Sequence, residues 1–186
     1  MRTADGSSYV FKGSQYWRLT RDSVAEGYPR NIGDDWTGLP DGVDVAFTWG
    51  NTGATYFFKG NKYWKFHNQT AASGYPRAVE EGFPGIPSSV DSAFVWGRNG
   101  KIYFTKNDKY WKFDPERSPH VQESHYPKPL SEWGLPRKIH GALQWENGLT
   151  YFFKGRDYWR FNDRTFSIDT ASPPFPRPAG PWWFGC

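Results

Sequence analysis

A four-residue aromatic phrase recurs four times along the chain and constrains the fold more than any other feature. The phrase is Tyr-Trp, then Lys or Arg, then Phe or Leu, and its tryptophans lie 47, 47 and 48 residues apart. The four copies begin at Tyr16, Tyr63, Tyr110 and Tyr158. Because so regular a period is typical of repeat architectures, we expect four copies of one supersecondary unit.

Each copy is preceded by an aromatic run and a turn, which together predict a β-hairpin. The runs begin at Tyr9, Tyr56, Tyr103 and Tyr151 and are rich in residue types that fit a pleated, half-buried surface. The turns contain residues that tolerate positive φ, namely Gly13-Ser14, Gly60-Asn61, Asn107-Asp108 and Gly155-Arg156. Two antiparallel strands around a tight turn are therefore expected in every copy.

Two further elements complete the unit. Tyr28-Pro29, Tyr75-Pro76, Tyr126-Pro127 and Phe175-Pro176 predict a proline at the start of a short helical turn. Segments 43–47, 90–94 and 139–143 predict a strand whose small residues suit the crowded innermost position of sheets around an axis. The sequence thus predicts an all-β, four-bladed propeller in one domain, with blades at about 1–42, 43–89, 90–138 and 139–186. In the first blade only residues 1–4 precede the Asp5-Gly6 turn, so we expect most of its innermost strand to be missing.

Composition agrees with a compact, aromatic-cored domain. The 186 residues include 37 aromatic ones (Trp 11, Tyr 11, Phe 15), and the formal net charge is +4. Eight of the 23 basic residues occupy fixed repeat positions, which favours solvated strand positions over one patch for nucleic acid. The N-terminus lacks a signal-peptide core, and no apolar run is long enough for direct membrane insertion.

The sequence does not predict catalysis. A zinc protease needs His-Glu-x-x-His, and no such string occurs among the four histidines. His120 and His125 flank Glu123, but nothing fixes a further metal ligand there. The paired acids Asp34-Asp35 and Glu80-Glu81 fall in the expected helical turns, where exposed acids are ordinary. We therefore expect that this chain is not itself an enzyme.

The sequence resembles the hemopexin-like domain of a matrix metalloproteinase. The resemblance rests on the repeated Tyr-Trp-Lys/Arg-Phe and Gly-Tyr-Pro phrases, the Gly-Leu-Pro motifs, the Asp-x-Ala-Phe strands and the terminal Trp-Trp-Phe-Gly-Cys. The resemblance covers the whole chain. It implies a propeller at the C-terminus of a secreted or cell-surface zinc endopeptidase whose catalytic domain lies outside this chain. It also implies a ring-closing disulfide from Cys186 to a cysteine upstream of Met1. A buried, inert thiol is the alternative, and a terminal position disfavours it.

The same resemblance implies calcium in the central channel, and no zinc in this domain. In this chain the resemblance implies that the ligands are the main-chain carbonyls of Asp44, Asp91 and His140, with those of Ala46, Ala93 and Ala142 one layer deeper. Converging carbonyls suit a hard cation. In the alternative interpretation, Asp44 and Asp91 only accept hydrogen bonds from neighbouring backbone amides.

By resemblance, the expected function is docking of collagen and other matrix proteins, of tissue inhibitors of metalloproteinases, or of a second copy of the domain. Contact residues are expected where the repeat pattern breaks, in segments 114–125 and 166–183. The adjacent Trp182 and Trp183 are the candidates, unless they pack the ring shut. The alternatives are a haem-type small-ligand propeller and a purely structural tether.

One modification motif is present. Asn68-Gln69-Thr70 fits the rule for N-glycosylation and follows the second hairpin in a polar segment. Glycosylation at Asn68 is expected if the host protein is secreted.

Overall fold

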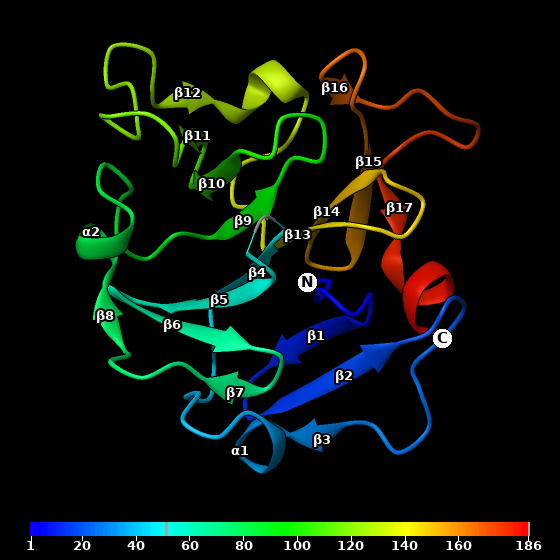
Figure 1. Cartoon of the computed structure of the whole chain (residues 1–186). Coiled ribbons are helices and arrows are strands. Elements are labelled where there is room, and N and C mark those ends of the chain that lie inside the picture. Colours follow the sequence, from blue (N-terminus) through cyan, green and yellow to red (C-terminus); the bar gives the residue numbers. More distant parts are fainter. Residues whose placement is uncertain (51, 186) are drawn as a thin grey trace.

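The computed structural model describes residues 1–50 and 52–185, and its strands form four small antiparallel sheets around one axis (Figure 1). The N-terminus lies at the centre of the ring, and the last helical turn lies beside the loop that follows β2. The arrangement confirms the predicted four-bladed β-propeller. Cys186, and with it the predicted disulfide, lies outside the described residues.

The blades share one strand order, which runs from the axis outward. Blade one contains β1 (Ser8–Lys12), β2 (Gln15–Leu19) and β3 (Arg30–Asn31). Blade two contains β4 (Val45–Trp49), β5 (Ala54–Lys59), β6 (Lys62–His67), β7 (Thr70–Ala71) and β8 (Arg77–Ala78). Blade three contains β9 (Ser92–Val95), β10 (Ile102–Lys106), β11 (Lys109–Phe113) and β12 (Lys128–Pro129). Blade four contains β13 (Gly141–Gln144), β14 (Thr150–Lys154), β15 (Asp157–Asn162), β16 (Ser167–Ile168) and β17 (Arg177–Pro178).

The predicted hairpins are confirmed in all four blades. The strand pairs close on two-residue turns, as in the pairing of Lys59 with Lys62 across Gly60-Asn61. The first turn residue has a left-handed backbone in each blade, with φ of 60° at Gly13, 59° at Gly60, 56° at Asn107 and 60° at Gly155. Glycine and asparagine tolerate this conformation best, which explains their recurrence there.

The helical turns are present, but the expected position of the prolines is wrong. The turns are α1 (Ile32–Asp35), α2 (Val79–Gly82), η1 (Leu130–Trp133) and η2 (Gly180–Phe184). The first three begin three residues after their proline, and η2 begins four residues after Pro176. The intervening residues pair with the second strand of the hairpin as β3, β8, β12 and β17. Extended backbone is favoured there because the open edge of that strand offers hydrogen-bond partners.

The innermost strands β4, β9 and β13 begin two residues later than predicted. The amide of Asp44 donates to the carbonyl of Phe58, although the ladder partner of Phe58 is Val45. Asp44 and Val45 therefore both face Phe58, and this extra residue in one strand is a β-bulge. Blade one lacks an innermost strand, as predicted, and only Met1 and Arg2 line that edge of β1.

Aromatic side chains fill the seams between neighbouring blades. In seam 1–2 the ring centroids of Trp36 and Phe57 are 5.1 Å apart. In seam 2–3, Phe83 lies 5.5 Å from Phe104, and in seam 3–4 the rings of Trp133 and Phe161 are 5.7 Å apart. Seam 4–1 differs, because within residues 1–50 and 52–185 no aromatic pair crosses it.

Candidate functional site

The axis of the ring holds a cavity of roughly 530 Å³. Its walls come from β1, from the starts of the three innermost strands, and from η2. Its principal lining residues are Val10, Lys12, Asp44, Ala46, Ser92, Ala93, His140, Leu143, Phe153 and Trp183. The described part of blade one has no strand inside β1, so β1 itself lies on the cavity wall.

The three residues predicted at the metal site lie at equivalent positions around this axis. The Asp44 carboxylate accepts a hydrogen bond from the Gly60 amide at 2.8 Å, and the Asp91 carboxylate accepts one from the Asn107 amide at 2.6 Å. His140 Nδ1 accepts a bond from the Gly155 amide at 3.2 Å. The side chains therefore brace the hairpin turns, as the hydrogen-bonding interpretation expected.

The main-chain carbonyls of these three residues, unlike their side chains, stand outside the regular hydrogen bonding of the sheet. Each carbonyl belongs to the extra residue of a β-bulge. The amides of Asp44, Asp91 and His140 donate to the carbonyls of Phe58, Thr105 and Phe153, and these three acceptors already pair in the ladder with Val45, Ser92 and Gly141. The extra residue of a bulge stands outside the regular ladder. In the part of the chain that the structure describes, these three carbonyls accept no hydrogen bond. Asp44 and His140 line the cavity and Asp91 does not, and carbonyl oxygens without partners are suitable ligands for a hard cation such as Ca²⁺.

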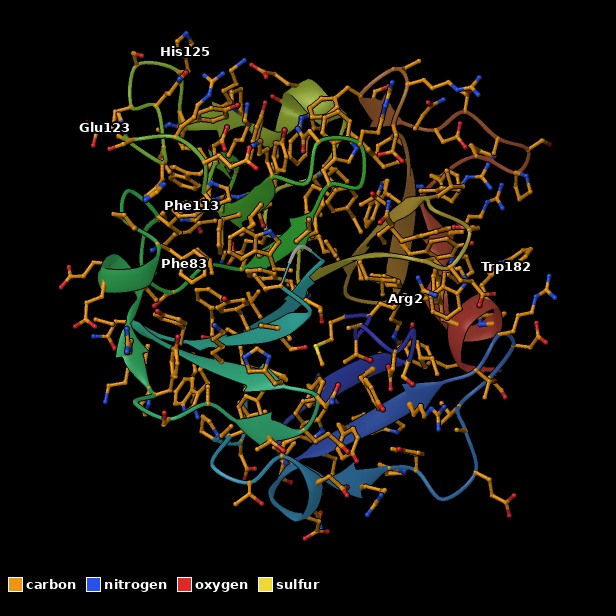
Figure 2. All side chains as sticks on the ribbon, viewed as in Figure 1. Arg2, Phe83, Phe113, Glu123, His125 and Trp182 are labelled. Carbon is orange, nitrogen blue, oxygen red and sulfur yellow. The ribbon has the colours of Figure 1, made fainter. Side chains whose placement is uncertain are left out.

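The two adjacent tryptophans have opposite environments. Trp183 is 8% exposed, and its ring lies 5.0 Å from both Trp145 and Tyr151. Trp182, a residue of η2, is 57% exposed and lies on the outside of the ring (Figure 2). Among the described residues it is the only large hydrophobic side chain that is exposed. Trp183 packs the interior, so only Trp182 is available to a partner.

An arginine holds Trp182 in place. The Arg177 guanidinium lies 4.4 Å from the ring centroid of Phe175 and 5.7 Å from that of Trp182. We call Phe175, Arg177 and Trp182 the Trp182 platform. Blade two contains the counterpart pair Tyr75 and Arg77, 5.1 Å apart, in the same Pro-containing phrase.

The pattern-breaking segment 114–125 is anchored by a buried acid. Asp114 is 6% exposed and lies 2.8 Å from Lys101 Nζ and 3.5 Å from Arg117 Nε. Burial acts to raise the pKa of Asp114, but the Lys101 ammonium and the Glu116 amide hold it below its ordinary value. Glu123 and His125 lie at the outer end of the loop (Figure 2). Within the described residues no group of metal-binding side chains is present there.

Asn68 lies at the exposed tip of the turn between β6 and β7, with a φ of 53°. His67 pairs with Thr70 across it, so the glycosylation tripeptide spans a two-residue turn. Its position on the surface leaves room for a glycan.

Sequence reasoning missed the arginine of the platform. The available signal was the phrase aromatic-Pro-Arg, which occurs at Tyr28, Tyr75 and Phe175. The arginine lies over the ring two residues before it in blades two and four, whereas Arg30 of blade one pairs with Asp35 at 2.8 Å.

Comparison with known proteins gives a consistent result. A family model described as Hemopexin matches residues 2–41, 43–88, 90–137 and 139–186. Human vitronectin is 54% identical over 41 residues, which is 22% of this chain and 9% of that protein. Human matrix metalloproteinase-17 is 44% identical over 48 residues, 26% of this chain and 8% of that protein. The alignments thus cover less than a tenth of the length of these relatives.

Solved structures with the same fold include plant proteins. A plant lectin with two metal binding sites from Cicer arietinum matches with a TM-score of 0.78 and 20% identity, over 95% of this chain and 90% of that one. The hemopexin fold protein CP4 from cow pea matches with a TM-score of 0.73, 20% identity and the same coverage. In the described part of the chain, no helix has the length and apolar character needed to cross a bilayer.

Proposed function

Because this chain belongs to the hemopexin family, we propose that it is a non-catalytic protein-recognition domain of an extracellular protein. The likeness to matrix metalloproteinase-17 supports a matrix endopeptidase as the parent, with its catalytic domain outside this chain. The partners proposed are collagen and other matrix proteins, tissue inhibitors of metalloproteinases, or a second copy of the domain.

The observation that carries this proposal is the Trp182 platform. Of 37 aromatic residues, Trp182 is the one large hydrophobic side chain exposed in the described part. Tryptophan and arginine are enriched among the residues that dominate binding energy, since both offer a large contact area. The Arg177 guanidinium lies over both rings, and a contact that restricts the indole before binding would lower the entropy cost of docking.

Docking on this surface would act through proximity. A domain that holds a large substrate raises its effective concentration at a catalytic site elsewhere in the parent. A short peptide substrate needs no second contact, so it gains nothing from the domain.

The test measures binding of the isolated domain to immobilised fibrillar collagen. We expect Trp182→Ala and Arg177→Ala each to weaken binding by roughly tenfold or more. Arg77→Ala is the matched control, because it removes the equivalent stack in blade two and should leave binding unchanged. Equal losses in all three variants, or no binding by the unmodified domain, would refute this assignment. Parallel measurements with a tissue inhibitor and by analytical ultracentrifugation identify the other two partners.

We also propose that the bulge carbonyls of Asp44, Asp91 and His140 hold Ca²⁺. The support is their lack of hydrogen-bond partners, their equivalent repeat positions and, for Asp44 and His140, their place in the cavity lining. A ligand that binds only the folded state raises the melting temperature by mass action. Millimolar CaCl₂ should therefore raise it, and equal MgCl₂ should raise it less, because Mg²⁺ gives up its water reluctantly. An unchanged melting temperature in calcium would contradict the proposal.

The last proposal concerns the exposed turn at Asn68. If the parent passes through a secretory pathway, this tripeptide is accessible to glycosylation. Secretion from eukaryotic cells should give a mass shift that Asn68→Gln removes. A secreted protein of unmodified mass would exclude the site.

A further inference from the structure

An ion-pair network of blade three is not repeated in blade four. In blade three the Lys101 ammonium lies 2.8 Å from the Asp114 carboxylate and 2.6 Å from that of Glu116. The hairpin register places other residues at the equivalent positions of blade four, namely Leu149, Asn162 and Arg164. Blade four therefore has an apolar side chain, an amide and a cation where blade three neutralises its own charges.

These three residues of blade four line a groove between blades three and four, with a volume of roughly 520 Å³. Arg98 reaches it from the loop between β9 and β10, and the rest of the lining comes from blade four. Among the described residues, none from blade one contributes to it. The principal lining residues are Arg98, Leu149, Asn162, Asp163, Arg164 and Asp169.

The two acids of the groove already have partners within the protein. Arg160 donates to the Asp169 carboxylate from Nε at 2.7 Å and from Nη2 at 2.6 Å. The Asp163 carboxylate accepts a hydrogen bond from the indole N–H of Trp96 at 2.5 Å. Each acid is thus held in place by a donor of the chain itself.

The arginines of the groove, in contrast, keep free donors. Arg98 gives one nitrogen, Nη1, to the main-chain carbonyl of Asp163 at 2.9 Å, and the Arg164 guanidinium makes no hydrogen bond or ion pair in the described part. Arg98, Arg160 and Arg164 against Asp163 and Asp169 leave a surplus of one positive charge. The guanidinium fork matches the geometry of a carboxylate. The groove is therefore complementary to a single carboxylate group.

The groove adjoins the Trp182 platform. The Arg160 guanidinium, which holds Asp169, lies 5.4 Å from the ring centroid of Phe175, a platform residue. Arg177 and Trp182 continue this row at 4.4 and 5.7 Å. The distance from the indole to Asp169 is therefore no longer than about six residues of extended chain, at roughly 3.3 Å per residue. One short segment of a partner can reach both places.

We propose that this groove is a second contact site of the docking surface and binds an acidic side chain of a protein partner. This proposal rests on the proposed recognition function and specifies the partner: an acidic residue within about six residues of the one that contacts Trp182. Its carboxylate would pair with Arg164 and Arg98, and its methylene groups would lie against Leu149. A sulfated glycan matches the groove less well, because a surplus of one charge cannot balance several sulfates.

The direct test is an NMR titration of the isotope-labelled domain with a short capped polyglutamate peptide at low salt, where screening is weak. The peptide has no apolar residue, so it probes the groove without the platform. We expect weak, millimolar binding, as for exposed ion pairs, with shifts of the Nε–H signals of Arg98 and Arg164. The matching polyglutamine peptide should not bind. Unmoved arginine signals, equal binding of both peptides, or displacement by a sulfated disaccharide at lower concentration would overturn the proposal.

Three variants locate the site. Arg164→Gln should weaken polyglutamate binding by about fivefold, and it should fold because this exposed side chain has no partner in the described part. Arg156→Gln removes the same charge at an exposed turn outside the groove and should change the affinity by less than about twofold. Trp182→Ala should leave this peptide unaffected, so failure of the platform and failure of the groove are distinguishable. Equal losses in the two arginine variants, full binding by Arg164→Gln, or loss of binding in Trp182→Ala would refute the assignment.

Discussion

Seam 2–3 and seam 4–1 use the same repeat positions but different residue types. In seam 2–3 the ring centroid of Phe83 lies 5.5 Å from that of Phe104 and 5.3 Å from that of Phe113. Phe83 and Phe113 are labelled in Figure 2. In seam 4–1 the positions of Phe104 and Phe113 are taken by Val10 and Leu19, beside the cavity. One interface is a continuous aromatic core, and the other is an aliphatic wall against Trp183.

Polar contacts follow the same division. Trp96 and Arg98 of blade three both bond to Asp163 of blade four, and lysine–carbonyl bonds brace the entries to blades two, three and four. Between residues 1–42 and the described residues of blade four, no hydrogen bond or ion pair is formed. The aromatic neighbours of Trp183 all belong to blade four. From this comparison we expect that the four seams are not equally stable, and that the ring opens most easily at seam 4–1.

The largest expected effect comes from truncating the aromatic seam. Phe113→Ala should reduce the free energy of unfolding by about 4 kcal/mol, since Phe113 is fully packed. Leu19→Ala, at the equivalent position in seam 4–1, should cost about 2 kcal/mol, because fewer packed atoms surround it. Urea denaturation of both variants measures the difference. Equal losses would remove the distinction between the seams.

The next effect separates the two adjacent tryptophans. Trp183→Ala should cost about 3 kcal/mol, because the indole fills the blade-four side of seam 4–1. Trp182→Ala should change stability by less than about 0.5 kcal/mol, since its side chain is largely exposed. The same denaturation assay reports both. A large loss in Trp182→Ala would show that it packs the ring and is not a docking residue.

Seam 4–1 should also be open to improvement. Leu19→Phe restores the residue found in the other three blades and fills space beside the cavity, so we expect a gain of about 1 kcal/mol. The reverse change, Phe161→Leu in seam 3–4, should destabilise the domain. Thermal melting of the two variants provides the comparison, and destabilisation by Leu19→Phe would show that seam 4–1 is already closely packed.

The smallest effect is a dependence on alkaline pH in the aromatic seams. Burial raises the pKa of Tyr103, in the seam 3–4 cluster, to about 12. The unfolded chain ionises this group at about pH 10, so its contribution to stability is complete below that pH and is lost as pH rises toward 12. Ultraviolet absorbance titration should show delayed ionisation, which Tyr103→Phe removes. Ionisation of every tyrosine near its ordinary pKa would contradict this.

The sequence predicted the repeat, the hairpins and the truncated first blade, because these depend on local turn chemistry and on periodicity. Gly60 and Asn107 have the left-handed backbone that a two-residue hairpin turn requires, whichever residues flank it. The start of each helical turn was mispredicted at Pro29 and its equivalents. There, pairing with the open edge of the second hairpin strand outweighs the preference of proline for a helix start.

The candidate site was less accessible from the sequence. Trp182 and Trp183 are adjacent and chemically identical, so their opposite burial emerges only when η2 packs against blade four. This difference depends on long-range packing, which local patterns do not encode.

Hydrogen–deuterium exchange followed by mass spectrometry tests the central claim most directly. If the ring opens at seam 4–1, the amides of β1 and η2 should exchange well before those of β9 and β10, under conditions where the domain stays folded. Leu19→Phe should slow exchange in β1 and leave β10 unchanged. Exchange of β9 and β10 at the same rate as β1, or ahead of it, would contradict an uneven ring.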